Sequence, residues 1–114
     1  MEISMKLNPT PFAMMKDGRK TIELRLCDEK RREISIGDII TFCNTEDPEL
    51  QINAQVTGLY AFDSFADLLA TLPLLECGYT EKSVANASPN DMDKYYSKEE
   101  QQKNGVIGIK VCLL

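Results

Sequence analysis

The sequence contains no histidine, and this absence removes the residue on which many catalytic and metal sites depend. Ser-His-Asp and Cys-His catalysis both need an imidazole, so a general acid or base here must be a carboxylate, lysine, tyrosine or cysteine. A zinc site would need thiolates alone. The cysteines, Cys27, Cys43, Cys77 and Cys112, are far apart, and none belongs to a Cys-x-x-Cys pair. We therefore predict reduced, partly buried thiols, with no bound metal and no cofactor.

Long apolar runs are also missing from the chain. No segment approaches the roughly 20 apolar residues that span a bilayer. The N-terminus, MEISMKLNPT, lacks the basic region and long apolar stretch of a signal peptide. We therefore expect a cytoplasmic protein with no membrane partner. Its 114 residues fit one domain, residues 1–114, which is large enough to bury a core without a disulfide or metal.

Positive charge is scarce overall but concentrated in one segment. The net charge of −5 argues against strong nonspecific binding of nucleic acid. Residues 16–32 nevertheless hold seven basic and four acidic side chains, whereas the remaining residues hold six basic and fourteen acidic ones. Two interpretations stay open. The segment is either a solvated turn with charges of both signs or a local seat for an anionic or polar ligand in an acidic molecule.

Hydrophobic periodicity and turn residues predict the order of the elements. Alternating apolar residues indicate strands at 2–7, 21–26, 36–43, 50–62 and 106–114, with a bulge at Gly58. Helical spacing and capping residues indicate helices within 8–17, 63–72 and 97–104. Gly18 is placed to end the first helix with a positive φ, and residues 27–35 are predicted to form a loop. A capping box of Ser97 and Glu100 opens the last helix.

This order lacks the strand–helix alternation of a doubly wound fold. It predicts the α+β class, with about five or six strands in a small, mostly antiparallel β-barrel flanked by short helices. Barrel closure is expected because it removes exposed strand edges.

The strand predicted at 21–26 combines an apolar face with a charged one. Its isoleucine and leucines face a core, while Glu23 and Arg25 share the opposite face. Lys20 has the other parity and joins this pair only if the chain bends after Gly18. The pair is either structural, contributing ~0–1 kcal/mol if exposed, or part of a binding site. We expect an open, water-filled cleft, so that the loss of Arg25 costs little stability.

Gly18, Lys20, Glu23 and Arg25 form the pattern Gly-x-Lys-x-x-Glu-x-Arg, which resembles the signature of the ASCH family of ASC-1 homology domains. The segments IGDII, GYT, YYS and GVIGIKV extend the resemblance over nearly the whole chain. The resemblance implies a fold like that of the PUA RNA-binding domain, with a cleft beside the helix that precedes the motif. It also implies that the partner bound there is RNA or a nucleoside- or nucleotide-like small molecule.

The resemblance implies ligand-binding roles for the three charged residues. Lys20 would be a mobile cation for a phosphate or leaving group, and Arg25 a planar fork for a carbonyl, base edge or phosphate. Glu23 would accept from a base amine or hold Arg25 in place. Tyr96, next to Tyr95, is the candidate for stacking on a base. The alternative is that the three charges form a structural network.

One branch of the family implies an enzyme. Its members are amidohydrolases that remove the acetyl group from N4-acetylcytidine with a lysine, a nucleophilic threonine three residues later and a downstream glutamate. Here Lys20 matches the lysine, Glu23 stands at the position of the threonine, and Glu76 is the candidate downstream glutamate. In this alternative Glu23 activates water while Lys20 polarises the amide carbonyl.

Overall fold

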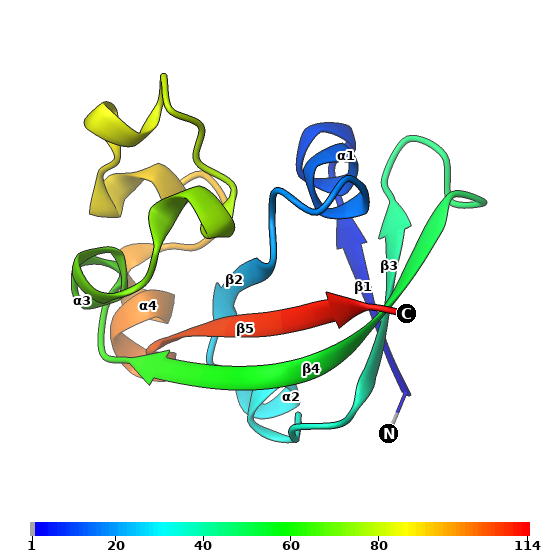
Figure 1. The fold of residues 1–114 in the computed structure, drawn as a ribbon. Helices are drawn as coiled ribbons and strands as arrows, with labels where there is room; N and C mark the ends of the chain where they lie inside the picture. The colour runs from blue at the N-terminus through cyan, green and yellow to red at the C-terminus, as the bar shows by residue number, and fades with distance from the viewer. Residues whose placement is uncertain (1) are drawn as a thin grey trace.

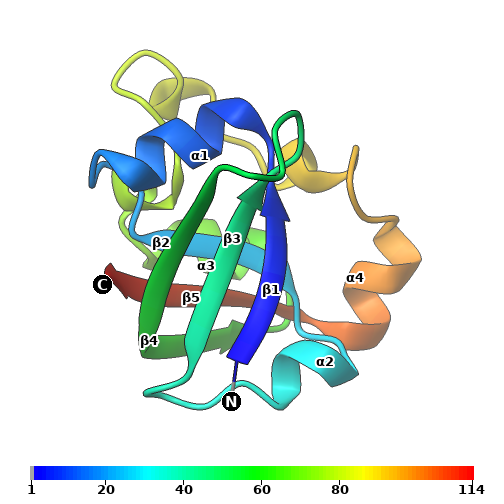
Figure 2. The ribbon, with the colours of Figure 1, turned by 90° about the vertical axis from the view of Figure 1, so that its right-hand side faces the viewer.

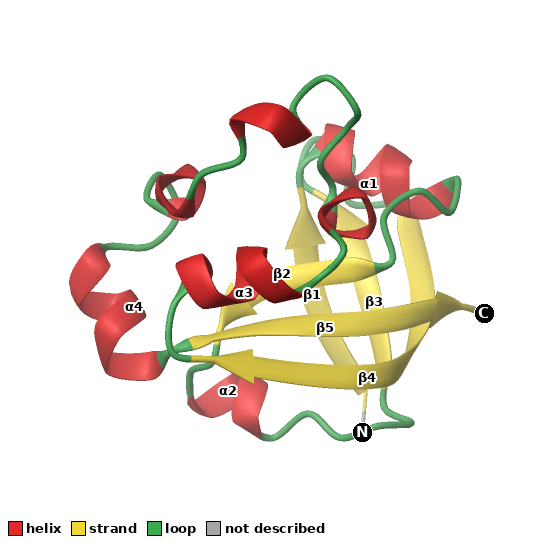
Figure 3. Cartoon of the chain, turned by 60° about the vertical axis from the view of Figure 1, so that its left-hand side comes forward, coloured by secondary structure: helices red, strands yellow, loops and turns green. Residues whose placement is uncertain are grey.

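The computed structural model describes residues 2–114, which form one mixed sheet and several short helices (Figures 1 and 3). The strands are β1 (Glu2–Leu7), β2 (Ile22–Leu26), β3 (Ile39–Asn44), β4 (Gln51–Phe62) and β5 (Val106–Leu113). The α-helices are α1 (Pro9–Lys16), α2 (Glu29–Arg32), α3 (Phe65–Thr71) and α4 (Lys98–Asn104). Three 3₁₀ turns, η1 (Leu74–Cys77), η2 (Val84–Asn86) and η3 (Pro89–Met92), lie between α3 and α4. The predicted α+β class is confirmed.

The five strands are arranged in the order β1-β3-β4-β5-β2. The β1–β3 pair is parallel and the other three pairs are antiparallel. Figure 2 shows β1 at one edge of the curled sheet. A register shift between Val56 and Gly58 marks the predicted bulge in β4, and such bulges bend a strand and increase its twist. The result is a half-barrel, because within residues 2–114 the end strands β1 and β2 share no backbone ladder.

The apolar core consists of two clusters on opposite faces of the sheet. One fills the inside of the half-barrel and contains Phe42, Ile107 and Ile109. The other joins the apolar side chains of β2 to those of α3, among them Leu24 and Leu68. Strand β2 is therefore covered on both faces, unlike a strand with one dry and one solvated side.

Short-range signals account for most of the element boundaries. Ser97 and Glu100 form the expected capping box of α4, and Gly18 follows the end of α1 with a φ of 87°. Helix α2 is an exception, because residues 27–35 were predicted to be a loop. The Asp28 side chain accepts a hydrogen bond from the Arg31 backbone and caps a helix of four residues. A single turn without buried side chains leaves no apolar periodicity to detect.

Within the part of the chain that the structure describes, no helix has the length and apolar character needed to cross a membrane. The segment that carries η1, η2 and η3 lies next to β2 and α3, on the outer face of the sheet (Figure 1). It contributes Cys77, Tyr79 and Met92 to the cluster on β2. This segment therefore forms a wall next to the strand that carries the charged motif.

Candidate functional site

A cleft of about 290 Å³ opens where β2 passes between the end of β1 and the η1–η3 segment. Residues 6–8 and Pro11 line one side, and Cys77, Met92 and the two adjacent tyrosines line the other. Lys20, Glu23 and Arg25 lie between them. The structure thus brings the three charged motif residues together at one concave place.

The turn after α1 brings Lys20 to its position. Gly18 adopts the left-handed conformation that glycine tolerates best. The backbone amides of Arg19 and Lys20 then both donate to the carbonyl of Met14, at 2.9 and 3.1 Å. The chain therefore bends before β2 begins, and Lys20 joins Glu23 despite its opposite parity in the sequence.

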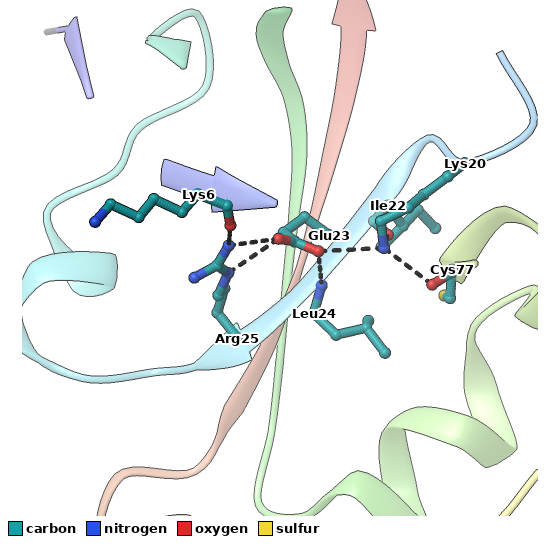
Figure 4. A network of polar contacts seen from close by, with 7 residues as sticks. All are labelled: Lys6, Lys20, Ile22, Glu23, Leu24, Arg25 and Cys77. Carbon is teal, nitrogen blue, oxygen red and sulfur yellow. Dashed lines mark hydrogen bonds and ion pairs between the residues drawn. The ribbon is translucent and has the colours of Figure 1, made fainter. Parts of the chain in front are cut away.

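The ammonium group of Lys20 has all of its donors engaged by the protein itself (Figure 4). Nζ donates to the carbonyl oxygens of Ile22 at 2.9 Å and Cys77 at 3.0 Å. It also lies 3.2 Å from Oε1 of Glu23. An ammonium carries three N–H groups, so these three acceptors use its full capacity. Lys20 is held in place here and is not the mobile cation that the sequence suggested.

The carboxylate of Glu23 is equally occupied. Oε1 accepts from Lys20 and from the backbone amide of Leu24, each at 3.2 Å. Oε2 accepts from Nε and Nη2 of Arg25, at 3.0 and 2.7 Å. Two oxygens offer about four acceptor positions, and all four are filled. Burial alone would raise the pKa of Glu23, but the charges of Lys20 and Arg25 outweigh it and hold the pKa below its ordinary value.

Arg25 extends the network across the gap between the end strands. Nη2 donates to the carbonyl oxygen of Lys6 in β1 at 2.7 Å as well as to Glu23 (Figure 4). A guanidinium has five N–H donors; three of them donate to Glu23 and to the Lys6 carbonyl, and a side-chain hydrogen bond with Tyr96 also affects the pKa of Arg25. Arg25 is therefore the member of this network with hydrogen-bonding capacity left for a ligand.

The expectation of an open, water-filled site is wrong for two of the three charges. Lys20 and Glu23 are each 5% exposed, and the Arg25 side chain is 17% exposed. The reason is register: Glu23 and Arg25 stand opposite Ile109 and Ile107, so they face the interior of the half-barrel. The apolar face of β2 packs on α3 at the same time, and the strand has no solvated face.

The two adjacent tyrosines play different roles. Tyr96 stacks on Phe65, with ring centroids 6.4 Å apart, and thus belongs partly to the core. Burial raises the pKa of Tyr96. Tyr95 is 53% exposed at the mouth of the cleft, and Nζ of Lys94 lies 5.2 Å from its ring centroid. Tyr95 therefore presents the more accessible ring, whereas the sequence analysis favoured Tyr96.

Glu76 is the predicted site residue that the structure places elsewhere. Its carboxylate accepts a hydrogen bond from the Thr21 hydroxyl at 2.7 Å and lies 3.8 Å from Nζ of Lys110. It does not line the cleft with Lys20 and Glu23. The neighbouring Cys77 does line the cleft, and burial raises the pKa of its thiol to about 11.

Sequence reasoning missed the contribution of β1 to the cleft, although the family resemblance placed the cleft beside α1. Lys6 and Asn8 line it, yet they stand ten or more residues before the motif and carry no local signal of a binding site. Their position follows from the curl of the sheet, which brings the edge strand β1 opposite β2. Within residues 2–114 no group of three or more Cys, Asp or Glu side chains is arranged to hold a metal ion.

The charged lining of the cleft has an excess of positive charge. Lys6, Lys20 and Arg25 are cations, and Glu23 is the one carboxylate among the described lining residues. Two of these cations share Glu23 as their counter-ion. Buried charges are costly unless they are paired, so this arrangement favours an anionic group placed near Arg25.

The sequence and the fold both resemble those of known proteins. The sequence profile described as "ASCH domain" matches residues 5–113. The crystal structure of hypothetical protein PH0355 is 30% identical, with a TM-score of 0.80 and full coverage of both chains. The solution structure of PF0455 from Pyrococcus furiosus is also 30% identical, with a TM-score of 0.75, covering all of this chain and 98% of that one.

A more distant structure shares the fold. The ASCH protein of Zymomonas mobilis is 16% identical, with a TM-score of 0.64, covering 97% of this chain and 66% of that one. No curated protein gives a significant match.

Proposed function

Because the chain belongs to the ASCH domain family, which is generally thought to bind RNA, we propose that its cleft binds RNA or a nucleotide-like ligand through an anionic group. The observation that carries this proposal is the charge balance of the network. Lys20 and Arg25 share one carboxylate, Glu23, and the network is buried enough that water screens it poorly. A phosphate at Arg25 supplies the missing negative charge.

Arg25 is the contact for that phosphate. Its Nε and Nη2 are fixed by Glu23 and by the Lys6 carbonyl, so the guanidinium is preorganised and its plane is set. Charge-assisted hydrogen bonds from arginine to phosphate are strong. Lys20 and Glu23 act as positioning residues in this proposal, because their own hydrogen-bonding capacity is spent inside the protein.

The size and walls of the cleft suit one nucleotide unit. Ligand pockets for drug-sized molecules measure roughly 300–1,000 Å³, and this cleft, at about 290 Å³, is at the lower limit. Tyr95 offers an exposed ring at the mouth, and base–aromatic stacking contributes about 1–3 kcal/mol per base. A nucleotide whose base stacks on Tyr95 and whose phosphate contacts Arg25 uses both the aromatic and the charged side chains of the cleft.

Hydrolysis of an acylated nucleoside, the alternative function, finds no support in this geometry. The carboxylate of Glu23 has no acceptor position left to activate water, and Lys20 has no donor left to polarise a carbonyl. Glu76 lies outside the cleft lining, and the Cys77 thiol is protonated near neutral pH. The expected result of incubation with N4-acetylcytidine is that no cytidine forms.

The test is calorimetric titration with the four nucleosides and their 5′-monophosphates. We expect at least one monophosphate to bind more tightly than its nucleoside, and Arg25→Gln to abolish the difference. Tyr95→Ala weakens both ligands, whereas the control Tyr60→Ala, at an exposed tyrosine of β4 away from the cleft, changes neither. Equal binding of nucleosides and monophosphates, or no binding of either, would contradict the proposal.

A further inference from the structure

The free edge of β1 connects the cleft to a second hollow. Lys6 lines the cleft, and the residue before it, Met5, lines a hollow of about 350 Å³ at the start of the strand. Ser4 and two residues of α2, Lys30 and Arg31, line this second hollow as well. Figure 2 shows α2 below the start of β1 and α1 above its end. Lys6 of the cleft and Ser4 and Met5 of the second hollow all belong to this strand.

Backbone groups along this edge are directed away from the sheet. The Lys6 carbonyl points across the open side of β1, where it accepts from Arg25. Residues two apart in a strand direct their backbone groups to the same side. The N–H and C=O of Ser4 therefore face the same open edge, about 7 Å further along the strand. Ser4 is also exposed, so its hydroxyl adds a donor on this path.

Arg31 has an unused donor at the second hollow. Its Nη1 lies 3.3 Å from Oδ2 of Asp28. Its Nε is buried and, within residues 2–114, has no hydrogen-bond partner. Buried polar atoms without a hydrogen-bond partner are rare in folded proteins and call for an explanation. The guanidinium also lowers the pKa of Tyr96, although burial makes the net shift of that pKa upward. Arg31, although it belongs to α2, therefore interacts electrostatically with Tyr96 in the wall of the cleft.

We propose that the cleft and the second hollow form one track for single-stranded RNA, with one nucleotide in the cleft and the following phosphates along the edge of β1 toward Arg31 and Lys30. This inference rests on the proposed function of the cleft. Lys6, Arg25, Lys30 and Arg31 supply positive charge along the track, and Glu33 supplies the negative side chain of the second hollow. In this proposal the basic residues of α2 bind phosphates, whereas a site for a single nucleotide gives them no role.

An open strand edge can also bind an extended peptide by strand addition. The charge of the track favours RNA over such a peptide. Strand addition needs an uninterrupted row of free backbone groups. Here Arg25 already occupies the Lys6 carbonyl. A polyanion is also complementary to the cations along the track, whereas a peptide of ordinary composition is not.

The experiment compares RNA tetramers with the matching nucleoside 5′-monophosphates in binding to the full chain. We expect the best tetramer to bind about tenfold or more tightly than its monophosphate at low salt, since each further phosphate contact releases counterions. The slope of log affinity against log salt should become steeper by about 0.7 for each added contact. A DNA tetramer of the same sequence reports whether the ribose hydroxyls contribute.

Single charge removals locate the track. Lys30→Ala should lower tetramer affinity several-fold and flatten the salt slope by about 0.7, while monophosphate affinity stays the same. Lys30 is exposed, and within residues 2–114 its side chain forms no hydrogen bond or ion pair, so this variant should fold normally. Arg31→Ala should have the larger effect. Lys16→Ala, in the last turn of α1, removes the same charge from a residue outside both hollows and should change neither ligand.

The outcomes separate this inference from the proposed function. If a monophosphate binds but the tetramer binds no better, the edge of β1 is not a track and the cleft takes single nucleotides. The same conclusion follows if Lys30→Ala and Lys16→Ala weaken the tetramer equally. If neither ligand binds but an extended peptide does, the edge serves strand addition and both proposals fail.

Discussion

Replacing Glu23 by glutamine tests the central claim about the charged network. The substitution keeps the shape of the side chain but removes the carboxylate that pairs with both Lys20 and Arg25. Two buried cations then face a neutral amide, and the NH₂ group of that amide is directed at the N–H donors of Lys20 or Arg25. Glu23 is 5% exposed, so little water is present to compensate. We expect this to be the most destabilising single change in the network.

The magnitude follows from the burial of the partners. Removing one member of a buried ion pair costs about 3–5 kcal/mol. A domain of this size loses about 4 °C in Tm per kcal/mol, so we expect a fall of about 12–20 °C. Arg25→Met leaves Lys20 and Glu23 as a neutral pair and loses mainly hydrogen bonds, at a cost of about 2 kcal/mol. We therefore expect Glu23→Gln to cost more than Arg25→Met, whereas both variants would be mild if the two side chains lay in an open, water-filled cleft.

Thermal and urea denaturation followed by circular dichroism provide the measurement. Glu76→Gln is the matched control, because it makes the same chemical change at a glutamate whose side chain is 40% exposed and whose ion pair with Lys110 is long, at 3.8 Å. That control should cost no more than about 1 kcal/mol. If Glu23→Gln costs as little as Glu76→Gln, the description of Glu23 as a buried, fully bonded counter-ion is wrong.

Two further predictions concern protonation. The pKa of Glu23 is lowered in the folded protein, so its stabilising effect is complete above the unfolded value of about 4.3 and is lost as pH falls through the folded value. Denaturation midpoints between pH 7 and 3 should show a shallower acid loss for Glu23→Gln than for the wild type, and parallel curves would exclude this role. The second prediction is that Cys77, buried and with a pKa raised to about 11, reacts far more slowly with a thiol reagent at pH 8 than the exposed Cys112. Peptide mapping of the labelled protein measures both rates, and similar rates would show that the cleft wall opens readily.

The motif and the local boundaries could be predicted from the sequence because they depend on neighbouring residues. The bend after Gly18 and the capping box of Ser97 follow from rules that act over three or four positions. The grouping of Lys20 with Glu23 and Arg25 followed from the same bend.

Long-range features could not be predicted in this way. The pairing of β1 with β3, and the position of Lys6 opposite Arg25, depend on the order of strands in the sheet. Alternation in β2 showed that Glu23 and Arg25 share a face, but not that this face points into the half-barrel. The saturation of Lys20 depends on the carbonyl of Cys77, a residue 57 positions away. That contact turns an apparent ligand-binding lysine into a fixed one.

The hydrogen bond from Arg25 to the Lys6 carbonyl has a consequence for how the molecule can deform. A barrel sealed by a backbone ladder has a circumference fixed by register, and widening it would break several hydrogen bonds together. Here, within residues 2–114, the hydrogen bond that joins the two end strands comes from one side chain, so a change of rotamer at position 25 can alter the gap between β1 and β2 while every strand keeps its neighbours. The width of the gap and the order of the strands are therefore separable in this fold, because a change at residue 25 costs about 2 kcal/mol and not a whole strand ladder.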